Sequence, residues 1–154
     1  MELWQIEAYE EIRNVISAYN SFGDRGRFDE LMKLFAETAV MDIGDGRLYE
    51  GLEQIGEIFT GTRESLSVDE KPLYIQHHTS STHIEIQDTE RATSRSYFSV
   101  FLPHGIDHWG RYEDKFEKIN GKTLIETILD RLIQIDTNKN NIVVIGGNNY
   151  NSLK

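Results

Sequence analysis

The sequence predicts an α+β fold, with helices in the first half of the chain and a mostly antiparallel sheet in the second. In the first 60 residues most apolar side chains recur at spacings of three and four, as on one face of a helix. From Leu73 onward the period changes to the alternation of a strand. Asn120-Gly121, a pair typical of tight hairpins, separates two of the alternating runs. Helices followed by consecutive strands indicate helices packed on one face of a sheet.

The first half is expected to contain three helices and one hairpin. The first helix runs to about Phe22, and Gly23 and Gly26 interrupt its period around Asp24. Its apolar face consists of Ala8, Ile12, Val15, Ile16 and Tyr19. The next elements, in order, are a short helix over residues 28–35, a strand over 39–43, a turn over 44–46 that returns through 48–49, and a helix over 51–60.

The second half is expected to contain four long strands after a polar loop over residues 62–72. The strands cover residues 73–87, 91–102, 108–119 and 122–135, with turns at 88–90, 103–107 and 120–121. The chain is interpreted as one domain, residues 1–137, followed by a tail, residues 138–154. An apolar segment at 142–145 makes the tail either a further strand or an arm on a neighbouring subunit.

Composition narrows the classes of partner. A formal net charge of −10 on 154 residues argues against nucleic acids and anionic membranes, because both need clustered Lys and Arg. The absence of cysteine excludes disulfides and thiol nucleophiles. No apolar stretch approaches the ~18 residues that suggest a membrane span, and residues 1–7 do not look like a signal peptide, so a cytoplasmic location is expected. The expected partners are a small molecule and another copy of the chain.

Three motifs, in matching order and spacing, resemble the SnoaL-like and scytalone-dehydratase-like proteins of the nuclear-transport-factor-2-like superfamily. The first is YNSFGDRG (residues 19–26) followed by LFAETAV (34–40), the second is QHHTSS (76–81), and the third is GRYEDKFE (110–117) ahead of Asn120-Gly121. The resemblance covers roughly residues 5–135. It implies a cone, in which N-terminal helices pack in the concave face of a strongly curved sheet around a polar-lined pocket. Such sheets commonly pair into homodimers.

The resemblance also implies a kind of chemistry. Activities in the superfamily include dehydration, dehydrohalogenation, isomerisation and the aldol-type cyclisation of polyketide cyclases, usually without a metal or an organic cofactor. In the enzymes an Asp and a His in the pocket handle a proton, and here those positions are occupied by Asp24 and His77. Strand alternation places His77 on one face with Ile75 and Thr79. The alternatives are that Asp24 caps the second helix and that His77 is a packed core residue.

A secondary set of residues lies on the strands. His108, Tyr112 and Asp114 share a face by alternation, and that face is expected to be the inner one. His108 or Tyr112 would donate to a substrate oxygen, although Tyr112 also fits a core aromatic role. The candidate substrate-binding residues are Tyr19, Tyr112, His108, Trp109 and Arg131. No His-x-x-x-His or Glu-x-x-His spacing on a helix indicates a metal site, so none is expected.

The sequence departs from two relatives in ways that prevent transfer of a specific reaction. Gly23 replaces the Tyr that precedes the Asp of scytalone dehydratase, while Tyr19 and Ile128 replace a Lys and an Arg of the dehydrochlorinases. The expected function is therefore a cofactor-independent lyase or isomerase that acts on a small, largely apolar, oxygenated substrate. The alternative is a non-catalytic ligand-binding or dimerisation module of the same fold.

Overall fold

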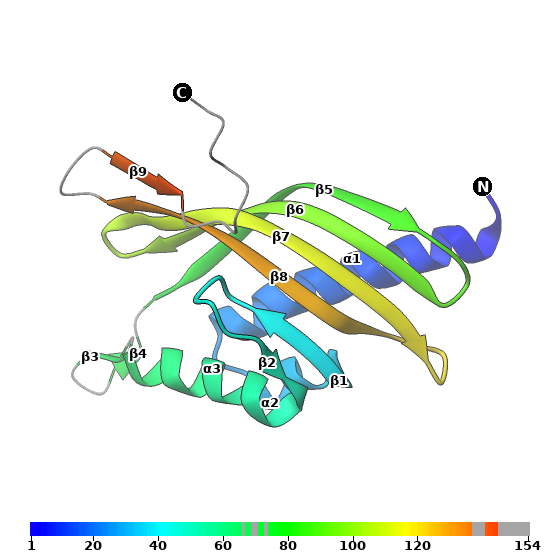
Figure 1. Cartoon of the computed structure of the whole chain (residues 1–154), viewed down its shortest axis with the longest axis horizontal. Helices are drawn as coiled ribbons and strands as arrows, with labels where there is room; N and C mark the ends of the chain where they lie inside the picture. The colour runs from blue at the N-terminus through cyan, green and yellow to red at the C-terminus, as the bar shows by residue number, and fades with distance from the viewer. Residues whose placement is uncertain (66, 69–70, 73, 137–140, 145–154) are drawn as a thin grey trace.

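A strongly curved sheet wraps around one long helix in the computed structural model of the chain (Figure 1). The structure describes residues 1–65, 67–68, 71–72, 74–136 and 141–144, with side chains at 1–62, 74–126 and 128. The helices are α1 (Leu3–Asp24), α2 (Phe28–Met32) and α3 (Gly51–Ser65). The strands are β1 (Phe35–Asp42), β2 (Tyr49–Glu50), β3 (Ser67–Val68), β4 (Lys71–Pro72), β5 (Gln76–Ile86), β6 (Arg91–Leu102), β7 (Gly105–Ile119), β8 (Lys122–Asp136) and β9 (Asn141–Val144).

The main sheet has the strand order β2-β1-β8-β7-β6-β5, and β9 pairs with β8. Among the strands described, β1 and β8 run parallel and all other pairs are antiparallel. α1 lies along the concave side of β5 to β8, and α2 and α3 lie below the edge formed by β1 and β2 (Figure 1). The predicted α+β class, with helices in the concave face of a curved and mostly antiparallel sheet, is confirmed.

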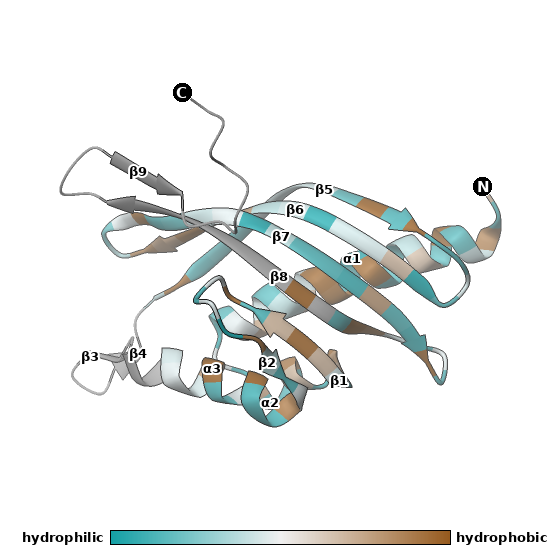
Figure 2. Ribbon diagram, viewed as in Figure 1, coloured by the Kyte–Doolittle hydropathy of each residue, from teal (hydrophilic) through white to brown (hydrophobic). Residues whose placement is uncertain are grey.

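The hydrophobic core lies between α1 and the inner face of the sheet. α1 contributes Ile12, Val15 and Ile16, three residues of its predicted apolar face. Alternate residues of the long strands pack against these side chains. Figure 2 shows hydrophobic residues recurring at intervals along α1 and β1. The buried positions of β6 and β7 are Ala92, Ser94, Ser96, Phe98, Val100, Gly110, Tyr112, Asp114 and Phe116. Strict alternation therefore sets which side chains can line the interior.

Several predicted boundaries differ from those observed. The sequence predicts Phe35 at the end of the second helix, but Phe35 begins β1 and pairs with Ile125 of β8. Short apolar runs fit either period, so the neighbouring strand decides the outcome. The expected loop over 62–72 contains the last turn of α3 and the small β3–β4 hairpin. The turn expected over 103–107 is shorter, because β7 already begins at Gly105.

Two irregularities shape the sheet near the turns. The predicted Asn120-Gly121 turn is confirmed, with φ of +51° and +78°, values suited to a tight hairpin. In β7 the register shifts by one residue, so that Ile106 pairs with Phe101 while His108 pairs with Val100. Asp107 is the extra residue of this β-bulge.

Candidate functional site

Asp24 and His77, 53 residues apart in sequence, are joined by hydrogen bonds at one end of the cone. Oδ1 of Asp24 lies 2.5 Å from Nδ1 of His77. The backbone N–H of His77 also donates to both carboxylate oxygens, at 3.0 and 3.2 Å. The side chains of His77 and Asp24 are 22% and 17% exposed, so both are screened from water yet reachable. With Nδ1 held by the carboxylate, Nε2 of His77 remains for a second partner.

The end of α1 explains how Asp24 is presented. Gly26 has a φ of +64°, and the N–H of Arg27 returns to the carbonyl of Phe22 at 2.9 Å, an arrangement that terminates a helix. The helix therefore ends at Asp24, just before the chain turns toward α2. The residue at the N-cap of α2 is Arg27, and its side chain makes no capping hydrogen bond. Asp24 bonds to β5 and does not cap α2.

β5, β6 and β7 place His77, Val100 and His108 in one row across the sheet. His77 pairs with Val100, and Val100 pairs with His108. Val100 is fully buried, so this row faces the interior. The ring of His108 lies edge-on to Phe98, with 6.0 Å between the ring centroids. Two imidazoles therefore flank the same part of the inner face.

Aromatic rings continue from His108 toward the helices. Phe98 stacks on Tyr112 at 4.3 Å between centroids, and Tyr112 meets Tyr19 edge-on at 6.2 Å. Tyr19 in turn contacts Phe35 and Phe59. Tyr112 is only 5% exposed, which places it in the core as well as in the aromatic wall. This wall is mainly apolar, and its polar groups lie at the edges of the rings.

One candidate substrate-binding residue, Trp109, lies apart from this group. Trp109 pairs with Ser99, between the inward positions of β6 and β7, and so lies on the outer face of the sheet. This corrects the expectation that Trp109 is a substrate-binding residue of the inner face. The backbone of Arg131 pairs with Arg111, but the side chain of Arg131 lies outside the described residues.

Asp107, which the sequence predicts only as part of a turn, is a neighbour of His108. Its Oδ2 lies 2.8 Å from Nδ1 of His108, and its Oδ1 lies 3.3 Å from Nε2 of His104. The β-bulge at Asp107 allows this contact between consecutive residues. The sequence does show an Asp directly before a His near the start of a strand. It does not show the bulge that brings the two side chains into contact.

A buried carboxyl lies deeper on the same face. Asp114 is 7% exposed and accepts a hydrogen bond of 2.8 Å from the hydroxyl of Ser94. Burial raises the pKa of Asp114 to about 7, against the lowering effect of Ser94. Elsewhere in the interior the side-chain oxygens of Asn20 and Ser96 are buried without a hydrogen-bond partner among the described residues. The interior is therefore not purely apolar.

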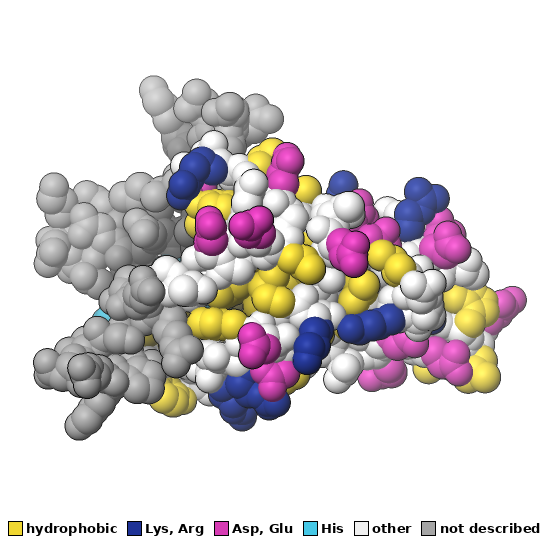
Figure 3. Space-filling view, turned by 90° about the horizontal axis from the view of Figure 1, so that it is seen from below, with side chains coloured by type: hydrophobic (Ala, Val, Ile, Leu, Met, Phe, Trp, Pro, Cys, Tyr) yellow, Lys and Arg dark blue, Asp and Glu magenta, His cyan; other side chains and the backbone are white. Residues whose placement is uncertain are grey.

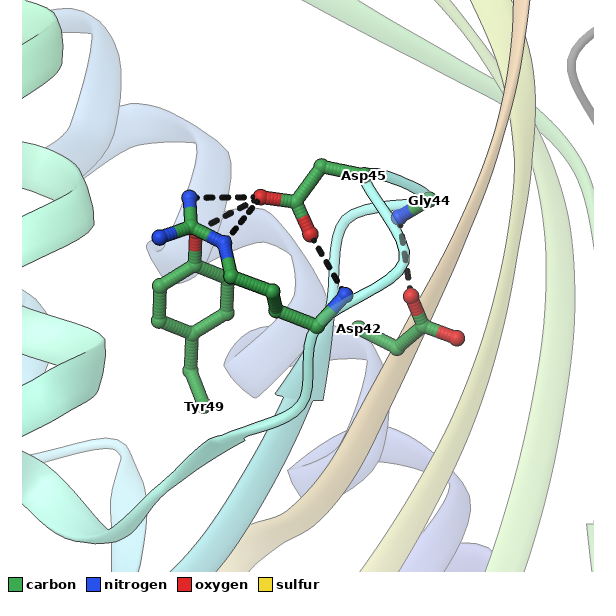
Figure 4. A network of polar contacts seen from close by, with 5 residues as sticks. Asp42, Gly44, Asp45 and Tyr49 are labelled. Atoms are coloured by element: carbon green, nitrogen blue, oxygen red, sulfur yellow. Dashed lines mark hydrogen bonds and ion pairs between the residues drawn. The ribbon is translucent and has the colours of Figure 1, made fainter.

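Polar contacts elsewhere serve the fold. In the β1–β2 turn, Tyr49 and Arg47 both donate to Asp45 and lower its pKa to about 2 (Figure 4). Asp42 accepts from the N–H of Gly44 in the same turn. The contacts of Asp45 are exposed and the contact of Asp42 is partly buried. Together they fix the turn by the side-chain-to-backbone bonds common in such loops.

Other surfaces carry less specific features. On the side of the molecule where α2 and α3 lie, acidic and basic side chains are interspersed around a strip of hydrophobic ones (Figure 3). A shallow depression near the N-terminal half of α1 includes Glu11, Asp88 and Glu90, away from the Asp24–His77 pair. None of the helices described is long and apolar enough to cross a membrane. Within the described part of the chain, no three His, Asp or Glu side chains converge on a possible metal position.

Comparisons with known proteins agree on the fold. The family model of the SnoaL-like domain matches residues 4–127. No curated protein matches the chain. Among solved structures, a proposed scytalone dehydratase from Novosphingobium aromaticivorans superposes with a TM-score of 0.75 at 18% identity, covering 86% of this chain and 88% of its own.

Two further structures are similar. A nuclear-transport-factor-2-like protein with a cystatin-like fold, also from Novosphingobium aromaticivorans, has a TM-score of 0.72 at 20% identity, covering 86% of this chain and 85% of its own. A protein of unknown function with a cystatin-like fold from Nostoc punctiforme has a TM-score of 0.70 at 18% identity, covering 80% and 90%. At these identities the similarity is one of fold.

Proposed function

The chain belongs to the SnoaL-like domain family, and from that premise we propose that it is a cofactor-independent lyase or isomerase. It removes a proton from a small, largely apolar, oxygenated substrate. The main support for this proposal is that Asp24 is hydrogen-bonded to both the ring and the backbone N–H of His77. The family is of the isomerase and dehydratase type, but membership alone does not assign a reaction.

His77 is the proposed base. Because its Nδ1 hydrogen is held by Asp24, its Nε2 lone pair is free to accept a proton from a carbon next to a carbonyl. The carboxylate then stabilises the imidazolium that forms. A Tyr or a second His assists at the substrate oxygen, while the aromatic wall formed by Phe98, Tyr112 and Tyr19 favours an apolar carbon skeleton.

The position of Asp24 supports a role beyond stability. A carboxylate at the C-terminal end of a helix meets the negative end of the helix dipole, which is unfavourable. Three hydrogen-bond contacts from one residue, His77, offset that cost. An uncharged side chain would suit this end of the helix better than a carboxylate. The presence of Asp24 here is therefore better explained by its role in orienting the imidazole of His77.

Exchange of α-protons with solvent tests the proposal without knowledge of the natural substrate. Cyclohexanone is incubated with the protein in D₂O, and the loss of the α-proton signals is followed by ¹H NMR. We expect exchange faster than in buffer, and we expect His77→Gln to lower the enzymatic rate by about 10²–10⁴, as loss of a general base does. His83→Gln is the matched control, because His83 also pairs with a carboxylate, Glu85, but lies 70% exposed.

The outcomes separate the enzyme from its alternative. If the His77→Gln variant exchanged α-protons as fast as the wild type, His77 would not be the base. Binding of cyclohexanone without any exchange above buffer would instead favour the non-catalytic ligand-binding module.

We also propose a homodimer formed through the outer face of the sheet. Tyr97 and Ile106 are 54% and 45% exposed on that face, and Phe101 and Trp109 lie half-buried beside them. On the same face, Nε of Arg111 is buried without a hydrogen-bond partner among the described residues. Apolar side chains grouped on a sheet face support association with a second copy.

A further inference from the structure

We propose that a β-bulge in the middle of β5 decides which of two adjacent histidines, His77 or His78, faces Asp24. Ser81, whose backbone conformation makes the bulge possible, is then a positioning residue for the proposed base. The choice of histidine is a matter of strand register, and only its effect on proton transfer rests on the proposed function.

The register of β5 against β6 shifts by one residue between Ser80 and His83. Two residues of β5, Ser81 and Thr82, therefore lie opposite one residue of β6, Ser96, which is the pattern of a β-bulge. Ser81 has a φ of +52°, in the left-handed region that residues with a side chain seldom adopt. The extra residue is thus accommodated at the cost of backbone strain.

The bulge allows both halves of β5 to bury their inward side chains. Seven positions separate His77 from Ile84 along the chain, so strict alternation would place these two side chains on opposite faces. Their partners on β6, Val100 and Ser94, are six positions apart and are both buried. The bulge absorbs the odd residue, so that His77 and Ile84 both face inward.

Without the bulge, β5 would bring His78 into the place of His77. If the Ile84 end stays in the core, regular pairing puts His78 opposite Val100. His77 would then face outward, where the ring of His78 now contacts Phe101 at 4.9 Å between centroids. Because β5 ends the described strand order of the main sheet, such a slip changes its strand pairing with β6 alone.

Two features at the start of β5 favour the bulged register. The side chain of Ile75 packs against the core, and in the slipped register the polar Gln76 would take its inward position. Asp24 is hydrogen-bonded to both the ring and the backbone N–H of His77. The strain at Ser81 opposes these features, so a side chain that raises this strain should shift the equilibrium toward the slipped register.

Substitution of Ser81 tests this equilibrium. Valine is β-branched and disfavours the left-handed region, so Ser81→Val should shift the equilibrium by about 10-fold toward the slipped register. In ¹⁵N NMR of the imidazole rings, the Nδ1–H tautomer that Asp24 holds on His77 should weaken, and His78 should gain it. Ser81→Gly tolerates a positive φ and should keep the wild-type tautomers. Ser80→Val, at an adjacent exposed residue without a positive φ, is the matched control and should also keep them.

A deletion provides the sharper test. Removing Thr82 takes away the extra residue, so that a regular β5 can place His77 and Ile84 on the inner face together. Position 81 then lies on the same face opposite Ser96, where valine suits a regular strand. Deletion of Thr82 should therefore restore the His77 tautomer to Ser81→Val. Two changes that only destabilised the protein would add to one another instead.

The proposed function predicts a matching change in proton transfer. In the wild type, His78→Gln should leave cyclohexanone exchange unchanged, because His78 lies on the outer face. In the Ser81→Val background, His78→Gln should lower the exchange rate, because a share of the molecules then presents His78 to Asp24. Deletion of Thr82 from that background should abolish this loss.

The outcomes separate this inference from the proposed function. Unchanged tautomers in Ser81→Val, the same effect from Ser80→Val, or a Thr82 deletion that fails to restore the His77 tautomer would each overturn the role of the bulge and leave His77 as the proposed base. No cyclohexanone exchange above buffer would overturn the proposed function, while the tautomers would still decide the register of β5.

Discussion

At the scale of single residues, three carboxyl groups lie in unusual places. Asp24 lies at the end of a helix that disfavours negative charge, Asp107 lies in a β-bulge, and Asp114 lies in the core. Asp24 and Asp107 each contact an imidazole, and Asp114 contacts a hydroxyl. Because each carboxyl has a different local environment, each is expected to respond differently to neutralisation.

Replacing Asp24 with Asn should affect exchange more than stability. Asn cannot hold the Nδ1–H tautomer of His77 or stabilise its imidazolium, so cyclohexanone exchange should fall by about 10²–10⁴. The unfolding free energy should fall by only about 1 kcal/mol, because relief at the helix end offsets part of the lost hydrogen bonding. Urea titration together with the exchange assay checks both values. A large loss of stability with normal exchange would show that Asp24 is structural.

The raised pKa of Asp114 leads to a prediction of how the unfolding free energy depends on pH. Its pKa is about 7 in the folded protein against an ordinary value of 3.8, so between these values the folded state holds a proton that the unfolded chain has released. By linkage, its contribution to the unfolding free energy falls as the pH rises from about 4 to about 7. The full effect is on the order of a few kcal/mol.

Urea denaturation between pH 4.5 and 8 measures this contribution. Asp114→Asn cannot ionise and can still accept from Ser94, so its stability should vary less with pH and exceed that of the wild type at pH 8. Glu85→Gln, at an exposed carboxylate, should keep the wild-type slope. If Asp114→Asn kept that slope too, Asp114 would not be the group responsible.

At the scale of elements, the β6–β7 turn and its bulge bring Asp107 to His108. β7 starts at Gly105, whose φ of +119° is strained for any residue with a side chain. Space is not the obstacle, since an added Cβ would meet nothing within 4 Å. The geometry of the bulge therefore depends on the backbone freedom of this glycine.

A matched pair of glycine substitutions tests this dependence. Gly105→Ala should destabilise the protein by about 1–3 kcal/mol and disturb the His108 tautomer, because strain at this position shifts the bulge. Gly121→Ala, in the β7–β8 turn with a φ of +78° and equally open space, should cost about 1–2 kcal/mol and leave His108 unchanged. Urea titration and imidazole NMR are the measurements. Equal effects of both variants on His108 would contradict the link.

At the scale of the whole molecule, α1 covers the concave side of the sheet and the outer side carries Tyr97, Ile106, Phe101 and Trp109. The proposed dimer covers these side chains. In sedimentation at micromolar concentration we expect the wild type to be a dimer and Tyr97→Glu to be monomeric or weakly associated, because the new charge would be buried. Leu48→Glu, at an equally exposed apolar residue in the β1–β2 turn, is the control and should remain dimeric. A monomeric wild type would contradict the proposal.

The sequence by itself determined the local features of the fold. The limits of β6 match the prediction over 91–102, and the Asn120-Gly121 turn forms as expected. The buried face of α1 contains the predicted Ile12, Val15 and Ile16. These features follow from side-chain periodicity and turn chemistry, which act over a few neighbouring residues.

Only the tertiary structure decided how distant residues meet. Resemblance to a family singled out Asp24 and His77, but their contact depends on where α1 ends and on where β5 begins. Phe35 became part of β1 because β8 was there to pair with it. The contact between Asp107 and His108 depends on the register of β7 and its bulge. One extra residue in a strand reverses which side chains face inward, and no local period encodes it, because register is set by the partner strand.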